Sequence, residues 1–171
     1  MRSDLKKALV LILCMMFVLT FFGCAKPASK PSAGIANPWQ TFETLAEAEA
    51  AAGFKLGMPE TVGSYKVSAY RVMNGEKPLF EVIYTDGDQK IDARKSQGEG
   101  QSISGVYGLG SAETAEIKGV SVKTSRASDK SETPNAVLTE FDFDGCSWSV
   151  YAPGGWSDET RAAFLSAILG S

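Results

Sequence analysis

The side chains best suited to bind or react in this 171-residue sequence form a short polar run at Arg94, Lys95 and Ser96, close to Gly98. Two cations and a hydroxyl next to a glycine could together bind an anion, so Arg94, Lys95 and Ser96 are the candidate ligand-binding residues. The alternative is structural, with Arg94 paired to Glu81 on a neighbouring strand and the rest forming a solvated strand end. We favour the structural interpretation and keep the anion site as a hypothesis.

Catalytic chemistry has few candidates. The sequence contains no histidine, which removes Ser-His and Cys-His catalysis and every histidine–metal scheme. Carboxylate pairs at Asp86/Asp88 and Asp142/Asp144 could serve a glycosidase, but turns and a solvated strand face explain both pairs. We therefore expect a protein that is not an enzyme and has no catalytic residue, with a carboxylate-dependent hydrolase as an alternative.

Two further motifs suggest ligands and are explained better by structure. The segment from Glu140 to Gly145 matches the first half of a calcium-binding loop, but Tyr151 stands where a bidentate glutamate is needed. The glycines between residues 105 and 110 run in the opposite order to the nucleotide-binding fingerprint. We expect no metal site and no cofactor.

Charge and cysteine content limit the partners. With 17 basic and 20 acidic residues the net charge is −3, which argues against nucleic acid as a partner. Of the three cysteines, Cys14 lies in an apolar N-terminal stretch and Cys24 directly follows it, which leaves Cys146 alone. We expect no internal disulfide and place Cys146 on the core face of a strand, as a small apolar residue.

The first 23 residues are typical of an export signal. Arg2, Lys6 and Lys7 precede 15 uncharged residues, Ala8 to Phe22, a stretch too short to span a bilayer. The following sequence, Phe-Phe-Gly-Cys ending at Cys24, resembles the lipobox of bacterial lipoprotein precursors, which implies a diacylglyceryl group on Cys24. A plain secretory signal, or an uncleaved N-terminal anchor with an incidental Cys24, are the alternatives.

Three regions follow from this: a signal peptide at 1–23, a lipidated cysteine with a flexible tether at 24–36, and a single domain at 37–171. Cleavage would remove three basic residues and one acidic residue, leaving 148 residues with a net charge of −5. Because an acidic domain is not attracted to anionic lipid, the lipid on Cys24 would make the membrane contact. We expect localisation at the outer face of the cytoplasmic membrane.

The domain is predicted to begin and end with a helix. Thr44 and Glu47 have the spacing of a capping box, and Gly53 would end the alanine-rich helix between them. Ser157 would cap the last helix, with a buried stripe formed by Phe164, Leu165, Ile168 and Leu169.

The sequence between the two predicted helices is expected to form β-hairpins. A turn at Asn74-Gly75 would set Ala69 opposite Phe80, and a four-residue loop at 86–89 would set Glu81 opposite Arg94. The apolar face would then consist of Tyr65, Val67, Ala69, Phe80, Val82, Tyr84, Ile91 and Ala93.

After a glycine-rich stretch, strands are predicted near 115–117 and 120–124. Asp144-Gly145 would form a type I′ turn that pairs Phe143 with Cys146 and leaves a polar opposite face, formed by Glu140, Asp142, Ser147 and Ser149. We predict an α+β fold with an antiparallel, curved sheet of about six to seven strands and two helices packed against it.

Several short motifs occur in a characteristic order over nearly the whole domain. They are Asn37-Pro38-Trp39, Leu45 to Glu49, Gly53-Phe54, Pro59, Ile91 to Gly98, Ile103-Ser104-Gly105, Ile117-Lys118-Gly119 and Asp144 to Val150. This order resembles a family of uncharacterised exported bacterial domains and lipoproteins. The family often has an aspartate just before the Ile-Ser-Gly triplet, where this chain has Ser102. The resemblance implies export and the fold, and it transfers no catalytic residue.

These observations predict a lipid-anchored, non-catalytic module that binds or senses an unknown component of the cell envelope. The first alternative is a carrier of an apolar ligand or a lipoprotein on a curved sheet, in line with a distant similarity to envelope proteins of that kind. The second is the carboxylate-dependent hydrolase.

Overall fold

The structure is a computed structural model that describes residues 37–128 and 131–170. The predicted signal peptide, Cys24 and the tether lie outside the described residues. Residues from Pro38 onward form a compact unit of their own. All its described core side chains, partly buried ones included, come from residues 42–169, so this unit contains its own core and we expect it to fold without the preceding residues.

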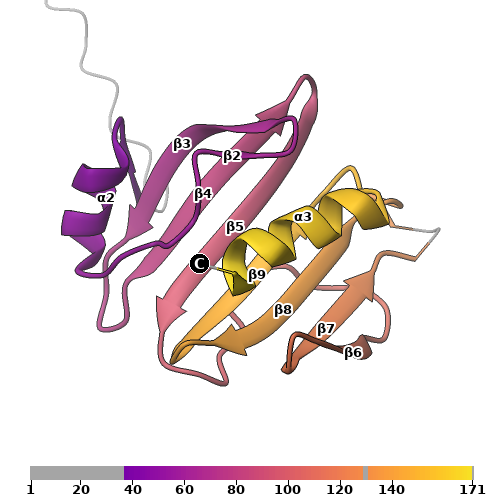
Figure 1. Ribbon diagram of the computed structural model, residues 1–171. Coiled ribbons are helices and arrows are strands. Elements are labelled where there is room, and N and C mark those ends of the chain that lie inside the picture. Colours follow the sequence, from indigo (N-terminus) through magenta and orange to yellow (C-terminus); the bar gives the residue numbers. More distant parts are fainter. Residues whose placement is uncertain (1–36, 129–130, 171) are drawn as a thin grey trace, which may run out of the picture. The chain divides into compact units, whose positions relative to one another are not determined.

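The described chain forms one antiparallel sheet and two helices, which confirms the α+β prediction (Figure 1). Eight strands follow the order β1-β3-β4-β5-β9-β8-β7-β6, and a ninth, β2, also pairs with β3. The elements are β1 (Trp39–Phe42), α2 (Leu45–Ala52), β2 (Thr61–Val62), β3 (Tyr65–Met73), β4 (Leu79–Asp86), β5 (Gln89–Gln97), β6 (Glu113–Ile117), β7 (Val120–Arg126), β8 (Val137–Phe143), β9 (Cys146–Ala152) and α3 (Asp158–Leu169).

Both helices are capped as predicted. The Thr44 hydroxyl accepts from the Glu47 amide, the Glu47 carboxylate accepts from the Thr44 amide, and Gly53 ends α2 with a left-handed φ of 78°. The Ser157 hydroxyl accepts from the Thr160 amide at the start of α3. The caps satisfy backbone donors that the first helical turn leaves unpaired.

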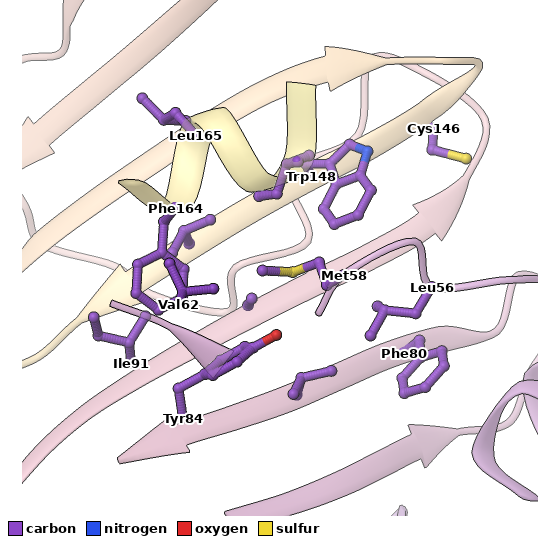
Figure 2. Close-up of a cluster of buried hydrophobic side chains, with 14 of the residues drawn as sticks. Leu56, Met58, Val62, Phe80, Tyr84, Ile91, Cys146, Trp148, Phe164 and Leu165 are labelled. Atoms are coloured by element: carbon purple, nitrogen blue, oxygen red, sulfur yellow. The ribbon is translucent and has the colours of Figure 1, made fainter. Parts of the chain in front are cut away.

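The two helices and one face of the sheet enclose a single core, and we call this the helix face (Figure 2). Phe164 of α3 lies at its centre, with its ring 5.1 Å from that of Tyr84, 5.8 Å from Tyr65 and 5.9 Å from Trp156. Leu165 and Ile168 are buried beside it as predicted, and Leu169 is half-buried. Aromatic side chains therefore fill the space between the sheet and α3.

The opposite face of the sheet, which we call the second face, carries a row of polar residues in register across five strands. These are Arg71 on β3, Glu81 on β4, Arg94 on β5, Ser149 on β9 and Glu140 on β8. Since side chains alternate along each strand, the apolar helix face and this polar row come from the same strands.

The predicted register of the first hairpin is wrong. Phe80 lies opposite Val72 rather than Ala69, because β3 and β4 are joined by a five-residue loop; a bulge between Val67 and Ala69 shifts the register again farther along β3. A two-residue turn would have placed Pro78 inside the ladder, where proline cannot donate a hydrogen bond. The longer loop therefore places Tyr70 and Val72, rather than Ala69, on the core face. The bulge then restores the predicted side, so Tyr65 is buried and Val67 packs against the core as predicted.

The other predicted registers are confirmed. Glu81 pairs with Arg94 on β5, although the turn between β4 and β5 has two residues rather than four. Phe143 pairs with Cys146, and the intervening Asp144 and Gly145 have φ of 53° and 69°, as a type I′ turn requires. Strands β6 and β7 lie where predicted, with slightly longer bounds.

The sheet is larger than predicted because two edge strands were missed. β1 pairs with Tyr70–Met73 and β2 with Tyr65–Lys66, so the two share the outer edge of β3. With four and two residues, neither strand is long enough to show an alternating pattern.

Candidate functional site

The three candidate ligand-binding residues are not brought together by the fold. Arg94, Lys95 and Ser96 are consecutive on β5, so Arg94 and Ser96 point to the second face and Lys95 to the helix face. Ser96 is buried and donates to the carbonyl of Pro78 at 3.0 Å. Each side chain thus has separate surroundings, and the geometry gives the anion-site hypothesis no support.

Lys95 ties the segment after α2 to the sheet. Its ammonium donates to the carbonyls of Lys55 at 2.8 Å and Leu56 at 3.1 Å, and lies 4.8 Å from the centre of the Trp148 ring. The Lys95 ammonium thus interacts with groups of its own domain, and its role is structural.

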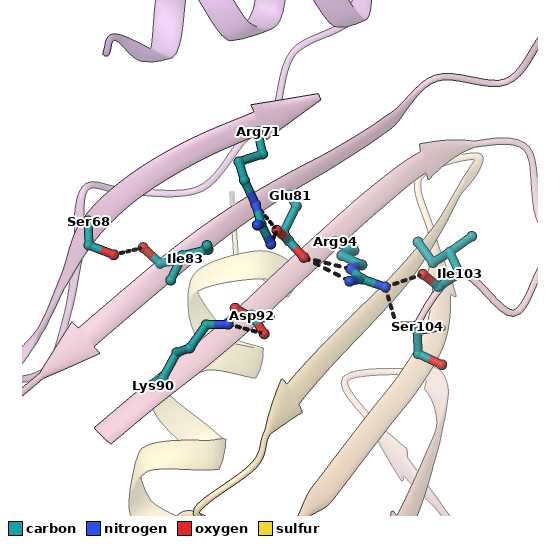
Figure 3. Close-up of polar contacts among 9 residues, drawn as sticks. All are labelled: Ser68, Arg71, Glu81, Ile83, Lys90, Asp92, Arg94, Ile103 and Ser104. Carbon is teal, nitrogen blue, oxygen red and sulfur yellow. Dashed lines mark hydrogen bonds and ion pairs between the residues drawn. The ribbon is translucent and has the colours of Figure 1, made fainter. Parts of the chain in front are cut away.

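Arg94 belongs to a buried charge cluster that we call the Glu81 clamp (Figure 3). Glu81 is fully buried, and its Oε1 accepts from Arg94 Nε at 2.9 Å, while its Oε2 accepts from Arg71. The Trp39 ring lies over both guanidinium groups, at 5.1 and 5.2 Å from its centre. The predicted pairing of Arg94 with Glu81 is confirmed, and β1 supplies the tryptophan that covers it.

The second face is covered by the glycine-rich segment 98–110, which we call the covering segment. Its backbone is attached along the sheet: Gly98 donates to the Gly145 carbonyl, Gln101 to the Ser147 hydroxyl, and Gly110 to the Arg126 carbonyl. The covering segment thus crosses the strands of the last hairpin and reaches β7.

The solvated face predicted for the last hairpin is therefore wrong in part. Ser147 and Ser149 are each only 1% exposed, although Asp142 is exposed and Glu140 partly so. Hydrogen bonds from the covering segment account for Ser147 and Asp142, whereas the buried Ser149 hydroxyl has no hydrogen-bond partner among the described residues.

Glycine at position 105 lets the covering segment approach the Glu81 clamp. Gly105 has a φ of 65°, and an added Cβ would lie 3.0 Å from Arg94 Nη1. That same Arg94 nitrogen donates to the carbonyls of Ile103 and Ser104. The glycine therefore allows a close backbone contact that a larger residue would obstruct.

A gap opens in the sheet between β7 and β8. Their ladder ends at the pair Lys123–Glu140, although β7 continues and pairs with β6, and β8 continues and pairs with β9. The next residue pair would be Val122–Phe141 and the next hydrogen-bonded rung Ser121–Asp142, and neither pair is formed. We call this gap, with Ser121 on one side and Asp142 on the other, the β7–β8 split.

A groove of about 530 Å³ lies at the β7–β8 split. One wall is formed by β7, one by β8, and a third by residues 100–102 of the covering segment. Its polar residues are Gln101, Ser102, Ser121, Lys123, Glu140 and Asp142. The groove therefore combines one cation, two carboxylates, two hydroxyls and an amide, and it reaches the core at Phe141.

The carboxylates of the groove are held in place by hydrogen bonds. Asp142 accepts from the Ser147 hydroxyl at 2.7 Å and from the Gly100 amide at 3.0 Å, while Glu140 accepts from Ser102 at 2.9 Å. These contacts fix the orientation of both carboxylates within the groove.

Three further carboxylates of the described chain lie outside the groove. Asp86 and Asp88 are exposed at the turn between β4 and β5. Burial raises the pKa of Asp92 on the second face, even though Lys90 approaches that carboxylate at 2.9 Å. In the described chain, no three acidic or cysteine side chains cluster closely enough to bind a metal.

The tryptophans and the cysteine serve the core and the Glu81 clamp. Trp39 covers the Glu81 clamp, Trp148 lies in the core, and Trp156 packs against Phe164. Cys146 is a free thiol in the core cluster, which confirms its predicted placement on the core face.

The groove residues were not among the candidates drawn from the sequence. Glu140 and Asp142 had been considered in a partial calcium-binding loop, and Asp142 in a carboxylate pair, but both were assigned to the polar side of a hairpin. Ser121 and Lys123 come from a different hairpin, and no local sequence pattern fixes how two hairpins pair or where their pairing ends.

Comparisons with protein-family models, with curated proteins and with solved structures give no match to this chain. Among residues 37–128 and 131–170, no helix has the length and hydropathy needed to cross a membrane.

Proposed function

We propose that this chain is a membrane-anchored lipoprotein of the cell envelope, whose domain binds or senses an envelope component without catalysing a reaction. The observation that carries the proposal is the polar groove at the β7–β8 split, which is open to solvent and reaches the core at Phe141. Its carboxylates are already positioned by the covering segment. Such a pre-formed polar recess suits recognition of a ligand.

The filled helix face favours this proposal over a carrier of an apolar ligand. A carrier needs a cavity between sheet and helices, and there the ring of Phe164 packs between those of Tyr84, Tyr65 and Trp156. A hydrolase would need a reactive pair of carboxylates, while both oxygens of Asp142 already accept hydrogen bonds within the chain.

Lipidation of Cys24 is tested by metabolic labelling with an alkyne-bearing fatty acid. We expect the wild type to be labelled and Cys24→Ala to be unlabelled, because the acyl groups depend on that thiol. Cys146→Ala is the matched control and should label like the wild type, since Cys146 is buried in the core. Equal, background labelling of wild type and Cys24→Ala would contradict the anchor.

Binding is tested by native mass spectrometry of residues 37–171 purified from the organism that carries the gene. We expect an added mass that disappears when the domain is denatured, because the groove would retain its ligand through purification. A retained lipid would instead favour the apolar carrier. A domain that carries no added mass, even when purified at low salt, would contradict the binding function.

A further inference from the structure

We propose that the β7–β8 split receives the end of an extended peptide, which would pair with the unpaired backbone of Ser121 and Asp142. This inference rests on the proposed binding function and names its ligand class. It follows from three features of the split: its backbone groups, its side chains and its closed floor.

The backbone groups facing the split follow from the two neighbouring turns. Along a strand, the N–H and C=O of successive residues point alternately to the two sides. Val120 forms the closing pair of the β6–β7 turn, so its backbone faces β6 and that of Ser121 faces β8. Phe143 likewise closes the β8–β9 turn, so its backbone faces β9 and that of Asp142 faces β7.

Ser121 and Asp142 therefore direct main-chain donors and acceptors into the split from opposite sides. In a continuous sheet they would pair with each other, as Lys123 and Glu140 do one rung earlier. An added strand would form hydrogen bonds with these backbone N–H and C=O groups, because an extended peptide presents donors and acceptors at the same spacing as a neighbouring strand. A free phosphate or a sugar would not reproduce that spacing.

The side chains around the split fit a peptide of mixed charge. Lys123 is exposed and could pair with an acidic side chain or a terminal carboxylate. Glu140 uses Oε1 for Ser102, so its other oxygen could accept from a basic side chain. Both charges lie on the second face, on the same side of the inserted chain.

The floor of the split is closed toward the core. Phe141 lines the groove and is only 5% exposed, and Val122 beside it is 1% exposed. An entering peptide would therefore meet the edge of the hydrophobic core without opening it. This confines the ligand to the split and gives it one apolar contact besides the polar ones.

The outer edge of β6 is the competing site for strand addition. Its residues Glu113–Glu116 are exposed, and the backbone of Thr114 faces away from β7. This edge offers pairing on one side only, whereas the split offers it on both sides together with the groove. We therefore infer that the split is preferred.

The test is an NMR titration of the nitrogen-15-labelled domain, residues 37–171. The added ligands are two capped hexapeptides of alternating threonine and valine. One peptide carries a central lysine and the other a central glutamate, and both are titrated to millimolar concentration. We expect the amide signals of Ser121 and Asp142 to shift and their hydrogen exchange to slow, because both amides gain acceptors.

Proline variants then locate the site. Ser121→Pro removes the donor that faces the split and places its ring there, so peptide affinity should fall about tenfold or more. Thr114→Pro is the matched control, since its missing donor faces solvent at the outer edge of β6, and it should bind like the wild type. Unchanged amide signals elsewhere in each variant verify that the fold is intact.

Three results would overturn the proposal: neither peptide shifts Ser121 and Asp142 in the wild type, the shifts lie along β6 instead, or Thr114→Pro weakens binding and Ser121→Pro does not. If the domain from its own organism retains a polar ligand that is not a peptide, this inference fails and the binding function stands. If neither that ligand nor a peptide binds, both fail.

Discussion

Replacing Glu81 with glutamine is expected to lower the free energy of unfolding by about 3 kcal/mol. Glu81 is fully buried and its two oxygens bind two arginines, so the substitution leaves Arg71 and Arg94 facing each other without an anion. Their side chains are only 25% and 18% exposed, so water compensates them incompletely. Glutamine keeps the size and removes the charge, which isolates the electrostatic effect.

Urea unfolding followed by tryptophan fluorescence measures this loss. Glu76→Gln is the matched control, because Glu76 is exposed in the loop between β3 and β4, and it should change stability by less than about 0.5 kcal/mol. The environment of Trp39 should also change, since its ring lies over both guanidinium groups. If Glu81→Gln costs no more than its control, the clamp contributes nothing and this description of the second face is wrong.

Replacing Phe164 with alanine is expected to cost about 3–5 kcal/mol. The ring is fully buried and packs against three other aromatic rings, so its removal leaves a cavity at the centre of the helix face. The rings around it belong to β3, β4 and the segment before α3, which limits collapse into the space.

Thermal or urea unfolding measures the effect, with Ser166→Ala as a control on the exposed side of the same helix. The control should be neutral or slightly stabilising, because alanine favours helix formation. A loss below about 1 kcal/mol for Phe164→Ala would mean that α3 packs loosely. Such a small loss would also favour the alternative function, a carrier that holds an apolar ligand between the helices and the sheet.

Local patterns predicted much of the fold. Thr44 with Glu47, and Asp144 with Gly145, are short motifs whose geometry is set by neighbouring residues, and both are confirmed. The pairing of Glu81 with Arg94 was also correctly predicted. The alternative register would have placed Glu81 directly opposite Asp92, and two like charges in that position repel each other.

The errors arise where distant parts of the chain decide the structure. The longer loop before β4 and the bulge after Val67 make the two halves of β3 bury opposite sides, and nothing in the local alternation indicates either. The burial of Ser147 and Ser149 depends on the covering segment, whose course over the second face is set by long-range hydrogen bonds.

The candidate site was missed for the same reason. Arg94, Lys95 and Ser96 are adjacent in sequence, and the alternation of a strand separates them. Ser121 and Asp142 are 21 positions apart and face each other only because two hairpins pair along part of their length. A sequence can indicate that each hairpin forms, whereas the end of the ladder between them depends on the twist and packing of the whole sheet.

The central claim is that this domain retains an envelope ligand at the β7–β8 split. Native mass spectra of wild type, Ser121→Pro and Thr114→Pro, each purified from the source organism, test it most directly. We predict the same added mass on wild type and Thr114→Pro and its loss from Ser121→Pro. Equal retention by all three proteins, or retention by none, would contradict the claim.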